Sequence, residues 1–543
     1  MSNAIFQVPV PENEPVLNYA PGSAERNQLK RELAAQQERQ SEISLIIGGE
    51  RVQTGHLGQM ALPHNHSRSL GVYHKAGEAE VMRAIEASRR AWRDWSRMPW
   101  EARAAIFLKA ADILTCRRRS EVNAAAMLDL SKTVHQSEID AIAELADFWR
   151  FNPYYMMRIM QPQPDSIPSV WNMLEYRPLE GFVFAVTPFN FASIAGNLPT
   201  APAMMGNTVV WKPASSAVYT AYQLMRILEE AGLPPGVINF LPGDGAAVGD
   251  PILSHPELAG VHFTGSTRVF QGIWRTVGAH IGRYRSYPRI VGETGGKDFV
   301  VAHTSADVPA LVTALVRGAF EYQGQKCSAA SRAYLPDSLW PQVRDQLLAE
   351  LSTVQVGDVA DFGNFMGAVI DAPAYRRITE YIELARTSPD TEILWGGAYD
   401  DSVGYLIQPT VVLSRDPHHR LMEEEIFGPV LTVYVYPEGQ FEETLRLCDS
   451  TSPYGLTGSI FAQDRRIIQQ ASDRLRHAAG NFYINDKPTG AVVGLQPFGG
   501  SRASGTNDKA GSPLNLERWV SPRTIKESFC PPVDYRYPYM GGH

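Results

Sequence analysis

An alternation of short apolar strands with amphipathic helices between Gly181 and Val301 constrains the fold of this chain more than any other feature. The strand candidates are FVFAV, NTVVWKP, VINFLPG, GVHFTG and RIVGETGG, and the clearest of the intervening helices is YTAYQLMRILEEAG. Strands that alternate with helices along a chain build a parallel sheet with helices on both faces. The sequence therefore predicts a doubly wound α/β domain in this region.

A second alternation follows Cys327. It runs through QVRDQLLAEL, YRRITEYIELART, VLTVYVY, ETLRLCD, GSIFA and NFYIN, and it predicts a second α/β domain. The length agrees with this division, because 543 residues exceed what one ordinary core accommodates.

Composition and charge narrow the classes of function. With 44% apolar and 20% charged residues the chain is typical of a globular protein, and a formal net charge of -8 argues against nucleic acid as a main partner. No apolar run approaches the roughly 20 residues that cross a bilayer, and the N-terminal MSNAIFQVPVPENEP lacks the basic and apolar parts of a secretory signal. We expect no membrane partner and a cytoplasmic location. If the chain is a mature form without its presequence, the mitochondrial matrix is the alternative.

The cysteine and histidine patterns predict no metal site. The motif HNH at 64–66 places two histidines in a turn with no third ligand nearby, so we interpret them as surface histidines. The cysteines are far apart and form no CxxC pair, which indicates a reducing compartment and no zinc cluster. There are four of them: Cys116, Cys327, Cys448 and Cys530.

Cys327 is the candidate nucleophile. It lies in EYQGQKCSAAS, between the helical pattern VPALVTALVRGAFEY and the strand pattern RAYLP, where backbone amides can face a substrate. A thiol is nucleophilic as the thiolate, and a nearby cation such as Lys326 or exposed amides would lower its pKa. A lone cysteine in an intracellular protein is more often a small buried hydrophobe. This segment alone leaves both interpretations open.

Several segments of the first α/β region favour a nucleotide site. No strict GxGxxG is present, and the nearest match, GDGAAVG around Gly245, has one residue too many between its second and third glycines. In GVHFTGSTRVF a strand leads through Gly265 and Ser266 into a helix, whose first amides can hold a pyrophosphate oxygen. In WKPASS, Lys212 leaves a strand end toward a ribose. Each junction occurs in many α/β proteins, and together they indicate a nucleotide at the carboxyl ends of the strands.

Three further motifs offer groups for carbonyl chemistry. Asn190 in TPFNF can present its amide to a developing oxyanion, or it can cap the following helix. Glu293 in GETGGK, 34 residues before Cys327, can activate a water as general base, or it can be a turn carboxylate. Glu425 and Phe427 in EEEIFGPVL lead into a buried strand, or they belong to a solvated charge run with one core aromatic.

Taken together, TPFN, the strand followed by WKP, FTGS, E-x-GGK, GQKCS and EEIFGPV resemble, in this order, the motifs of the aldehyde dehydrogenase superfamily. The similarity covers nearly the whole chain. FEYQGQKCSAASR, YINDKPTGAVVGLQPFGGSRASGTNDKAG and ELADFWRFN resemble in particular the 1-pyrroline-5-carboxylate dehydrogenases, which oxidise L-glutamate γ-semialdehyde to L-glutamate in proline breakdown. The resemblance implies an α/β, aldehyde dehydrogenase-like fold with a Rossmann-type NAD domain, an α/β catalytic domain and a small β oligomerisation ribbon.

The expected domain bounds follow the motifs and this resemblance. The strand VWNMLEYRP alternates in polarity and is a candidate for pairing with another subunit, and the tail ending in YRYPYM resembles an oligomer contact. We expect an N-terminal arm and helix at 1–40, an NAD-binding domain at 41–160 and 180–296, a catalytic domain at 297–498, and the oligomerisation ribbon with the C-terminal tail at 161–179 and 499–543.

The resemblance implies a role for each motif residue. Cys327 would attack the aldehyde carbon, Asn190 and the Cys327 backbone amide would stabilise the oxyanion, and Glu293 would help a water hydrolyse the thioester. The implied cofactor contacts are Lys212, Pro213, Ser215, Gly245, Gly265, Ser266, Glu425 and Phe427. The implied substrate contacts are Glu144 near the ammonium, Phe191 and Phe498 along the aliphatic part, and Ser328, Gly490 and Ala491 at the amino-acid end. No metal is implied.

The cofactor site departs from the pattern of many NAD-preferring relatives. These carry a glutamate shortly after the WKP lysine, where it binds both ribose hydroxyls, whereas this chain has Pro213-Ala214-Ser215-Ser216. A 2′-phosphate would meet no acid here. We therefore expect NAD as the cofactor and leave room for NADP as a weaker one. At Ala491, where relatives often have serine, the hydroxyl is missing but the backbone amide remains.

Three other functions compete with this interpretation. The chain can act on a different ω-semialdehyde, pass the acyl group to coenzyme A, or be a binding protein that kept the fold. Glu293 argues against acyl transfer, and intact Cys327, Asn190 and Glu293 argue against a non-catalytic role. We expect a small-molecule substrate and a homo-oligomer of at least two subunits. Some relatives are fused to a proline dehydrogenase domain, for which this chain has no room, so we expect at most a transient contact with a separate proline dehydrogenase.

Overall fold

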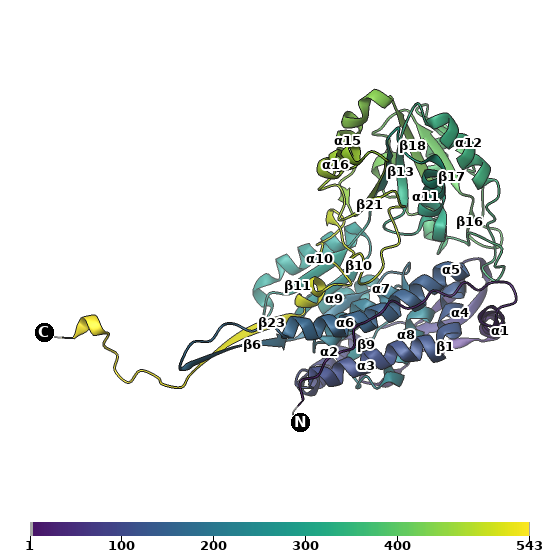
Figure 1. The fold of residues 1–543 in the computed structure, drawn as a ribbon. Helices are drawn as coiled ribbons and strands as arrows, with labels where there is room; N and C mark the ends of the chain where they lie inside the picture. Colours follow the sequence, from purple (N-terminus) through teal and green to yellow (C-terminus); the bar gives the residue numbers. More distant parts are fainter. Residues whose placement is uncertain (1–3, 542–543) are drawn as a thin grey trace.

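The structure, a computed structural model, describes residues 4–541 and shows two lobes joined along one seam (Figure 1). The lower lobe in the figure contains the N-terminal helices and one seven-stranded sheet, and the upper lobe contains the other. A narrow ribbon projects from the lower lobe, and the C-terminal segment runs on beyond it. The predicted α/β fold class is confirmed.

The first sheet has the strand order β11-β10-β7-β8-β9-β2-β3. Strands β7 to β11 pair in parallel, and β2 and β3 are added at one edge in antiparallel orientation. The order reverses between β7 and β10, so the loops after these two strands diverge and open a crevice at the carboxyl ends. The strands are β2 (Leu45–Ile47), β3 (Glu50–Val52), β7 (Phe182–Val186), β8 (Thr208–Lys212), β9 (Ile238–Phe240), β10 (Leu258–Thr264) and β11 (Arg289–Glu293).

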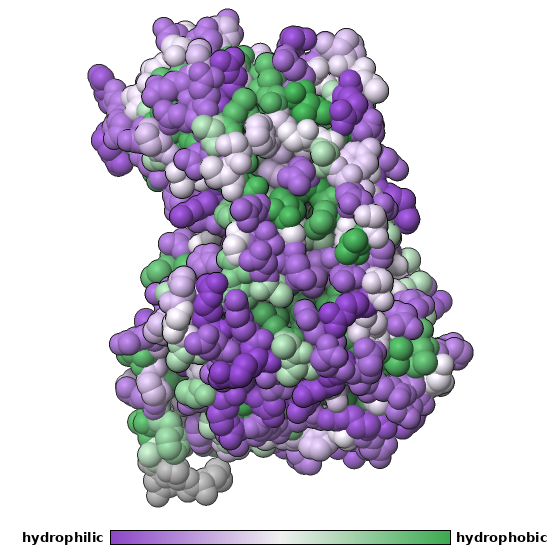
Figure 2. Space-filling model, turned by 90° about the vertical axis from the view of Figure 1, so that its right-hand side faces the viewer, coloured by the Kyte–Doolittle hydropathy of each residue, from purple (hydrophilic) through white to green (hydrophobic). Residues whose placement is uncertain are grey.

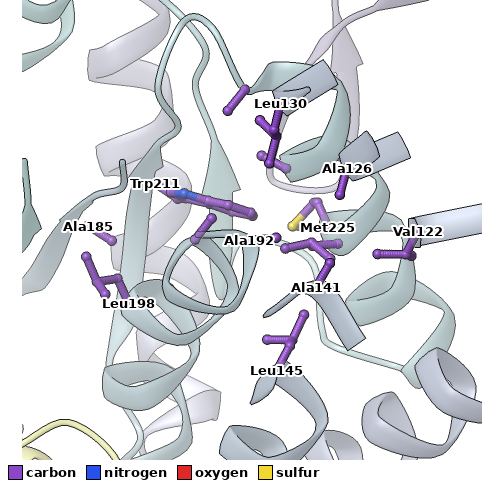
Figure 3. Close-up of a cluster of buried hydrophobic side chains, with 14 of the residues drawn as sticks. Val122, Ala126, Leu130, Ala141, Leu145, Ala185, Ala192, Leu198, Trp211 and Met225 are labelled. Carbon is purple, nitrogen blue, oxygen red and sulfur yellow. The ribbon is translucent and has the colours of Figure 1, made fainter. Parts of the chain in front are cut away.

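Both faces of the first sheet are buried, which explains its continuous apolar strands. Phe182 and Phe184 on β7 pack on one face with α2, α9 and α10, whereas Val183 and Ala185 pack on the other face with α7 and α8. Figure 3 shows part of this second cluster, with Trp211 of β8 at its centre. These helices are α2 (Glu78–Trp95), α7 (Ala192–Met204), α8 (Val218–Ala231), α9 (Gly245–Leu253) and α10 (Thr267–Ala279).

The N-terminal helices form a further layer over α7 and α8 (Figure 1). Two segments have π-helical hydrogen bonding, Ile113–Arg117 and Glu138–Glu144, and the second carries Glu144. A separate three-stranded sheet in the order β1-β5-β4 lies beside these helices. The elements are α1 (Ala24–Glu38), β1 (Ser41–Ile43), β4 (Leu57–Leu62), β5 (Asn65–His74), α3 (Trp100–Asp112), α4 (Arg119–Leu130), α5 (Val134–Ser137) and α6 (Leu145–Met160).

The second sheet has the order β14-β17-β18-β13-β12-β20-β21, parallel except for β14. Helices α11 and α12 cover one face, and α15 and α16 cover the other. The strands are β12 (Asp298–Ala302), β13 (Ala330–Pro336), β14 (Thr391–Trp395), β17 (Thr410–Ser414), β18 (Val430–Tyr436), β20 (Thr457–Phe461) and β21 (Asn481–Ile484). The helices are α11 (Val308–Phe320), α12 (Trp340–Leu351), α13 (Ala372–Thr387), α14 (Arg420–Glu423), α15 (Phe441–Ser450) and α16 (Arg465–Arg474).

The projecting ribbon consists of β6 (Val170–Pro178) and β23 (Val520–Ser528), paired in antiparallel orientation over their full length. The partner of the predicted VWNMLEYRP strand is therefore a distant strand of the same chain. Within residues 4–541 no strand pairs with the outer edge of β6 or of β23, although Ser166 and Gln163 bond the backbone of Asn172 and Leu174 on the β6 side. Beyond the ribbon the aromatic tail is exposed, with Tyr535 and Tyr539 more than 80% accessible. Short pieces complete the fold: β15 (Tyr399–Asp400), β16 (Leu406–Ile407), β19 (Tyr454–Gly455), β22 (Ser501–Arg502) and α17 (Pro513–Glu517).

Asn207 fastens the base of this ribbon to the first sheet. Its side-chain oxygen accepts from the backbone N of Leu179, directly after β6, at 2.9 Å. Its Nδ2 donates to the carbonyl of Trp519, directly before β23, and to that of Pro202, both at 2.9 Å. Asn207 is fully buried, so no water could bond these backbone groups if its side chain were removed.

We predict that Asn207→Ala destabilises the protein by about 2–4 kcal/mol, because it orphans buried backbone groups that each cost about 1–3 kcal/mol. The measurement is the urea midpoint of unfolding. Asn172→Ala is the control, since this side chain lies on the ribbon and donates to the Asp165 carbonyl at an exposed site. Equal midpoints for the two variants would contradict the assigned role.

Candidate active site

The crevice at the carboxyl ends of the first sheet gathers the motif residues of the first α/β region. Lys212 ends β8, Ser266 caps α10 directly after β10, and Glu293 ends β11. Asn190 follows the end of β7 by four residues. Parallel strands present their carboxyl ends on one edge, and this edge faces the upper lobe (Figure 1).

Cys327 reaches this crevice from the upper lobe, on the turn between α11 and β13. Just before it, Tyr322 and Gln323 have φ of 51° and 56°, a left-handed conformation that is costly for such side chains. The Tyr322 hydroxyl donates to the Leu130 carbonyl at 3.0 Å, and Gln323 Nε2 donates to the Ser131 carbonyl at 3.1 Å. Both groups are buried. The predicted helix-to-strand connection is confirmed, and buried hydrogen bonds hold its strained backbone.

Asn190 lies against the same turn. Its Nδ2 donates to the carbonyl of Gln325 at 3.0 Å, two residues before the cysteine. It does not cap α7, because Asp140 accepts the backbone N–H groups of Ala192 and Ser193 at 2.9 Å. The amide nitrogen has two hydrogens, so one remains for a ligand. This geometry favours the oxyanion interpretation over helix capping.

Glu293 and Cys327 face one solvent-poor space, and both have raised pKa values. Removal from water raises the pKa of Glu293 well above its usual range, although its Oε2 accepts from the Gly500 backbone N at 3.2 Å. Burial, followed by the negative charges of Asp298, Glu293 and Glu425, raises the pKa of the Cys327 thiol. The thiol therefore keeps its proton until a base removes it, and burial makes the carboxylate of Glu293 a stronger base than an exposed glutamate.

Lys326 does not lower the pKa of the neighbouring thiol. Its Nζ lies 3.1 Å from Glu321 Oε2, and this ion pair is buried. The expected cation beside Cys327 is therefore neutralised by a carboxylate.

A cavity of about 770 Å³ opens next to Cys327 and Glu293. Figure 2 shows hydrophobic side chains along the seam between the lobes on the face turned to the viewer. Every residue predicted to contact the substrate lines this cavity: Glu144, Phe191, Ser328, Gly490, Ala491 and Phe498. The cavity has a size that suits a small metabolite.

The cavity wall offers a carboxyl group and a polar loop. Removal from water, reinforced by the charge of Asp140, raises the pKa of Glu144 to about 8. A bound ammonium would favour its ionised form. Elsewhere on the wall, the Ser328 hydroxyl lies 2.8 Å from the Thr489 hydroxyl, next to Gly490 with its φ of 97°. Sequence reasoning missed Thr489, although it directly precedes the predicted glycine.

The predicted cofactor residues of the first α/β region lie at or just after the carboxyl ends of β8, β9 and β10: Lys212, Pro213, Ser215, Gly245, Gly265 and Ser266. Burial lowers the pKa of Lys212 to about 8, and among the described residues its ammonium makes one hydrogen bond, to the Pro213 carbonyl at 3.1 Å. The Ser215 hydroxyl donates to the Gly243 carbonyl at 3.3 Å. Gly245 opens α9, and an added Cβ there would meet no atom within 4 Å.

The loop before α10 is suited to phosphate oxygens. Gly265 donates its backbone N–H to the Glu293 carbonyl at 3.2 Å, and the Ser266 hydroxyl accepts from Val269 N at 3.4 Å. The exposed helix start leaves further amides toward the crevice. A buried ammonium and a helix N-terminus on one sheet edge fit the hydroxyls and the diphosphate of a dinucleotide.

The acidic run before β18 divides into two parts. Glu424 is paired with Arg420 at 2.9 Å on the surface, whereas Glu425 Oε1 accepts from Gly296 N at 2.9 Å inside the crevice. Removal from water raises the pKa of Glu425 to about 6. Phe427 has a φ of 57° and packs edge-on against Phe189. Only the first part of the run is a solvated charge run.

The prediction that both histidines of the HNH motif lie on the surface is wrong for His64. His64 is buried, with Nε2 3.7 Å from Asp358 Oδ1, and His66 stacks on Tyr405. The turn packs against the segment before β16, so it joins the lobes and leaves His64 little solvent. Within residues 4–541 no group of three or more His, Cys, Asp or Glu is arranged to hold a metal ion.

Comparison with known proteins agrees with this geometry. The model of the aldehyde dehydrogenase family matches residues 57–525. The chain belongs to this family. It is therefore an oxidoreductase of the aldehyde dehydrogenase type.

Similar curated proteins and solved structures cover the chain almost completely. The mitochondrial delta-1-pyrroline-5-carboxylate dehydrogenase of Dictyostelium discoideum is 52% identical over 536 residues, 98% of this chain and 96% of that protein. The Homo sapiens protein of the same name is 50% identical over 529 residues, 97% and 94% of the two chains. The crystal structure of the Mycobacterium tuberculosis delta-pyrroline-5-carboxylate dehydrogenase bound with NAD has a TM-score of 0.96, 53% identity and full coverage of both chains.

We predict that alkylation of Cys327 by iodoacetamide is slow at neutral pH and rises as the pH approaches the raised pKa of the thiol. Glu293→Gln removes one of the negative charges that raise this pKa, so the rise should move to lower pH. Mass spectrometry of the peptide that carries Cys327 separates its alkylation from that of the exposed Cys116 and Cys530.

The exposed Glu443→Gln, remote from the cavity, is the matched control for this shift and should leave the profile unchanged. Profiles that coincide for wild type and Glu293→Gln would show that the two groups do not interact.

Proposed function

We propose that this protein oxidises L-glutamate γ-semialdehyde, the open form of 1-pyrroline-5-carboxylate, to L-glutamate in proline breakdown, with NAD as hydride acceptor. The observation that carries the proposal is one cavity that combines the nucleophile with a carboxyl group and a polar loop. Cys327 supplies the nucleophile, Glu144 matches an α-ammonium, and the loop with Gly490 offers amides for an α-carboxylate. The names of the similar proteins support the same substrate.

We assign the first step to Cys327 and Asn190. The thiol gives its proton to Glu293, which passes it to water before the second step, and the sulfur bonds to the aldehyde carbon, which turns the carbonyl oxygen into an oxyanion. One hydrogen of the Asn190 amide is engaged with Gln325, and the other, together with the Cys327 backbone N–H, would donate to that oxyanion. NAD, when bound, accepts the hydride from this carbon.

We assign the second step to Glu293. Loss of the hydride leaves a thioester between the substrate carbon and Cys327. A water molecule attacks this thioester while Glu293 takes its proton, and the bond to sulfur breaks with release of the carboxylate product. The raised pKa of Glu293 makes its carboxylate a stronger base than that of an exposed glutamate.

The cofactor would lie along the carboxyl edge of the first sheet. Lys212 and Glu425 would contact ribose hydroxyls, and Ser266 with the start of α10 would hold the diphosphate. Pro213, Ser215, Gly245 and Gly265 would shape the adenosine side, and Phe427 the nicotinamide side. Because residues 213–216 contain no acid, NADP is proposed as a weaker cofactor.

Assembly and location are part of the proposal. The outer edge of β23, with which no strand pairs among residues 4–541, supports a homo-oligomer of at least two subunits. The solved structure of proline utilization A from Bdellovibrio bacteriovorus is similar to this chain over 54% of its own length. The chain therefore corresponds to one part of a larger protein of proline utilisation, which supports a transient contact with a proline dehydrogenase. No helix among residues 4–541 is long and apolar enough to cross a membrane. We infer the cytoplasm, with the mitochondrial matrix as the alternative that the relatives' names support.

We predict rapid NADH formation from 1-pyrroline-5-carboxylate by the wild type, a fall of at least about 10³-fold in Cys327→Ala because the nucleophile is lost, and slower turnover of butanal. The measurement is NADH absorbance under identical conditions for both substrates. Faster turnover of butanal would keep the mechanism and overturn the substrate. Equal rates for Cys327→Ala and wild type would overturn the mechanism.

A further inference from the structure

The N-terminal arm, residues 4–20, forms part of the substrate cavity. It runs in extended conformation across the lower lobe (Figure 1), and Asn13, Glu14 and Val16 line the cavity together with Glu293 and Cys327. The arm is far from Cys327 in the sequence, and the motifs discussed above give no sign of this position.

Buried and charged contacts fix the arm. The carboxylate of Glu14 accepts hydrogen bonds from Arg119 Nη1 at 2.7 Å and from Arg150 Nη1 at 2.6 Å. Further along, the Tyr19 hydroxyl donates to Glu138 Oε2 at 2.8 Å, and both side chains are buried. Charge-assisted hydrogen bonds are about twice as strong as neutral ones, so these contacts hold the arm firmly against the lower lobe.

Asn13 directly precedes Glu14 and links the arm to a loop of the cavity wall. Its Nδ2 donates to Asp147 Oδ2 at 2.7 Å and to the Val493 carbonyl at 2.8 Å. Both amide hydrogens are thereby used. The other oxygen of Asp147 accepts from the Glu14 backbone N at 2.7 Å, which fixes the position of the carboxylate.

Val493 belongs to the irregular segment 487–498, which we call the anchor loop. This loop carries Gly490 and Ala491, and its residues 489–493 all line the cavity. One end is held at the nucleophile, where Thr489 contacts Ser328 at 2.8 Å. The middle of the loop is held where Val493 packs on Phe148 and Phe151 and its carbonyl accepts from Asn13. The far end is held where Phe498 and Ala510 exchange backbone hydrogen bonds.

We propose that Asn13 is a positioning residue for the amino-acid end of the substrate. It fixes the middle of the anchor loop, on the other side of Gly490 and Ala491 from Thr489, so the amides of these two residues are directed into the cavity before the substrate arrives. This inference rests on the proposed function, because the loop matters only for a substrate with an α-carboxylate. Pre-organised donors bind without the cost of ordering a loop.

The test compares two aldehydes in the full-length enzyme. Asn13→Ala loses two hydrogen bonds, of which the one to the Val493 carbonyl holds the loop. It should raise KM for L-glutamate γ-semialdehyde about tenfold, with kcat within about twofold. Turnover of butanal, which has no α-amino acid end, should not change. Asn13→Asp should raise KM further, because its carboxylate would face Asp147 and the Val493 carbonyl.

Asn18→Ala is the matched control, since this arm residue accepts only from Ala20 N at an exposed site, and it should behave as wild type. An Asn13→Ala variant that loses activity equally on both aldehydes, or on neither, would overturn the proposal.

Hydrogen exchange of the substrate-free enzyme separates this inference from the proposed function. In Asn13→Ala the peptide covering 487–498 should exchange faster than in wild type, whatever the enzyme oxidises. Faster exchange confined to residues 4–20 would show that Asn13 holds the arm alone and would overturn the proposal. A wild type that prefers butanal would instead refute the proposed substrate.

Discussion

The position of Cys327 depends on the strained turn that precedes it. The left-handed backbone of Tyr322 and Gln323 costs free energy that buried hydrogen bonds must offset. Gln323 Nε2 donates to the Ser131 carbonyl of the lower lobe and to the Ala368 carbonyl of the upper lobe, and its Oε1 accepts from Gly367 N. The side chain of Gln323 therefore ties the nucleophile to both lobes. Any shift between the lobes would also displace the sulfur from the sheet edge.

The second constraint is the scarcity of solvent around the nucleophile. Removal from water raises the pKa of Cys327 and of Glu293, and it lowers the pKa of Lys212. Each of these shifts favours a neutral side chain in the absence of ligands. Side chains whose pKa values are displaced in this way gather at catalytic sites, because a charge formed during the reaction is weakly screened by water there. The same burial leaves Asn190 with one engaged and one spare amide hydrogen.

Much of the fold could be predicted from the sequence, because both sheets are covered on both faces and their strands are continuous apolar runs. The motif residues were found for a related reason: carboxyl ends of parallel strands are recognisable from strand-to-helix junctions, and Glu293 and Ser266 lie at such ends. The pairing of β6 with β23 could not be predicted, since it joins strands more than 300 residues apart.

The remaining differences also arise from contacts between distant segments. His64 has the sequence context of a surface turn and is buried by a segment of the other lobe. Asp140 caps α7 from another helix, which removes the local reason for Asn190 to do so. Asn13 lies in a terminal arm without any local signal, and only the folded chain brings it to Val493. Local patterns cannot encode such pairs.

The central claim is that Cys327 forms the covalent intermediate and that Glu293 is needed to hydrolyse it. The most direct measurement is intact-protein mass spectrometry of Glu293→Gln after mixing with 1-pyrroline-5-carboxylate and NAD. The account predicts a mass increase equal to the γ-glutamyl acyl group, located on the peptide of Cys327 and persisting for many turnover times of the wild type. An unmodified Cys327, or an acyl group lost as fast as in the wild type, would contradict it.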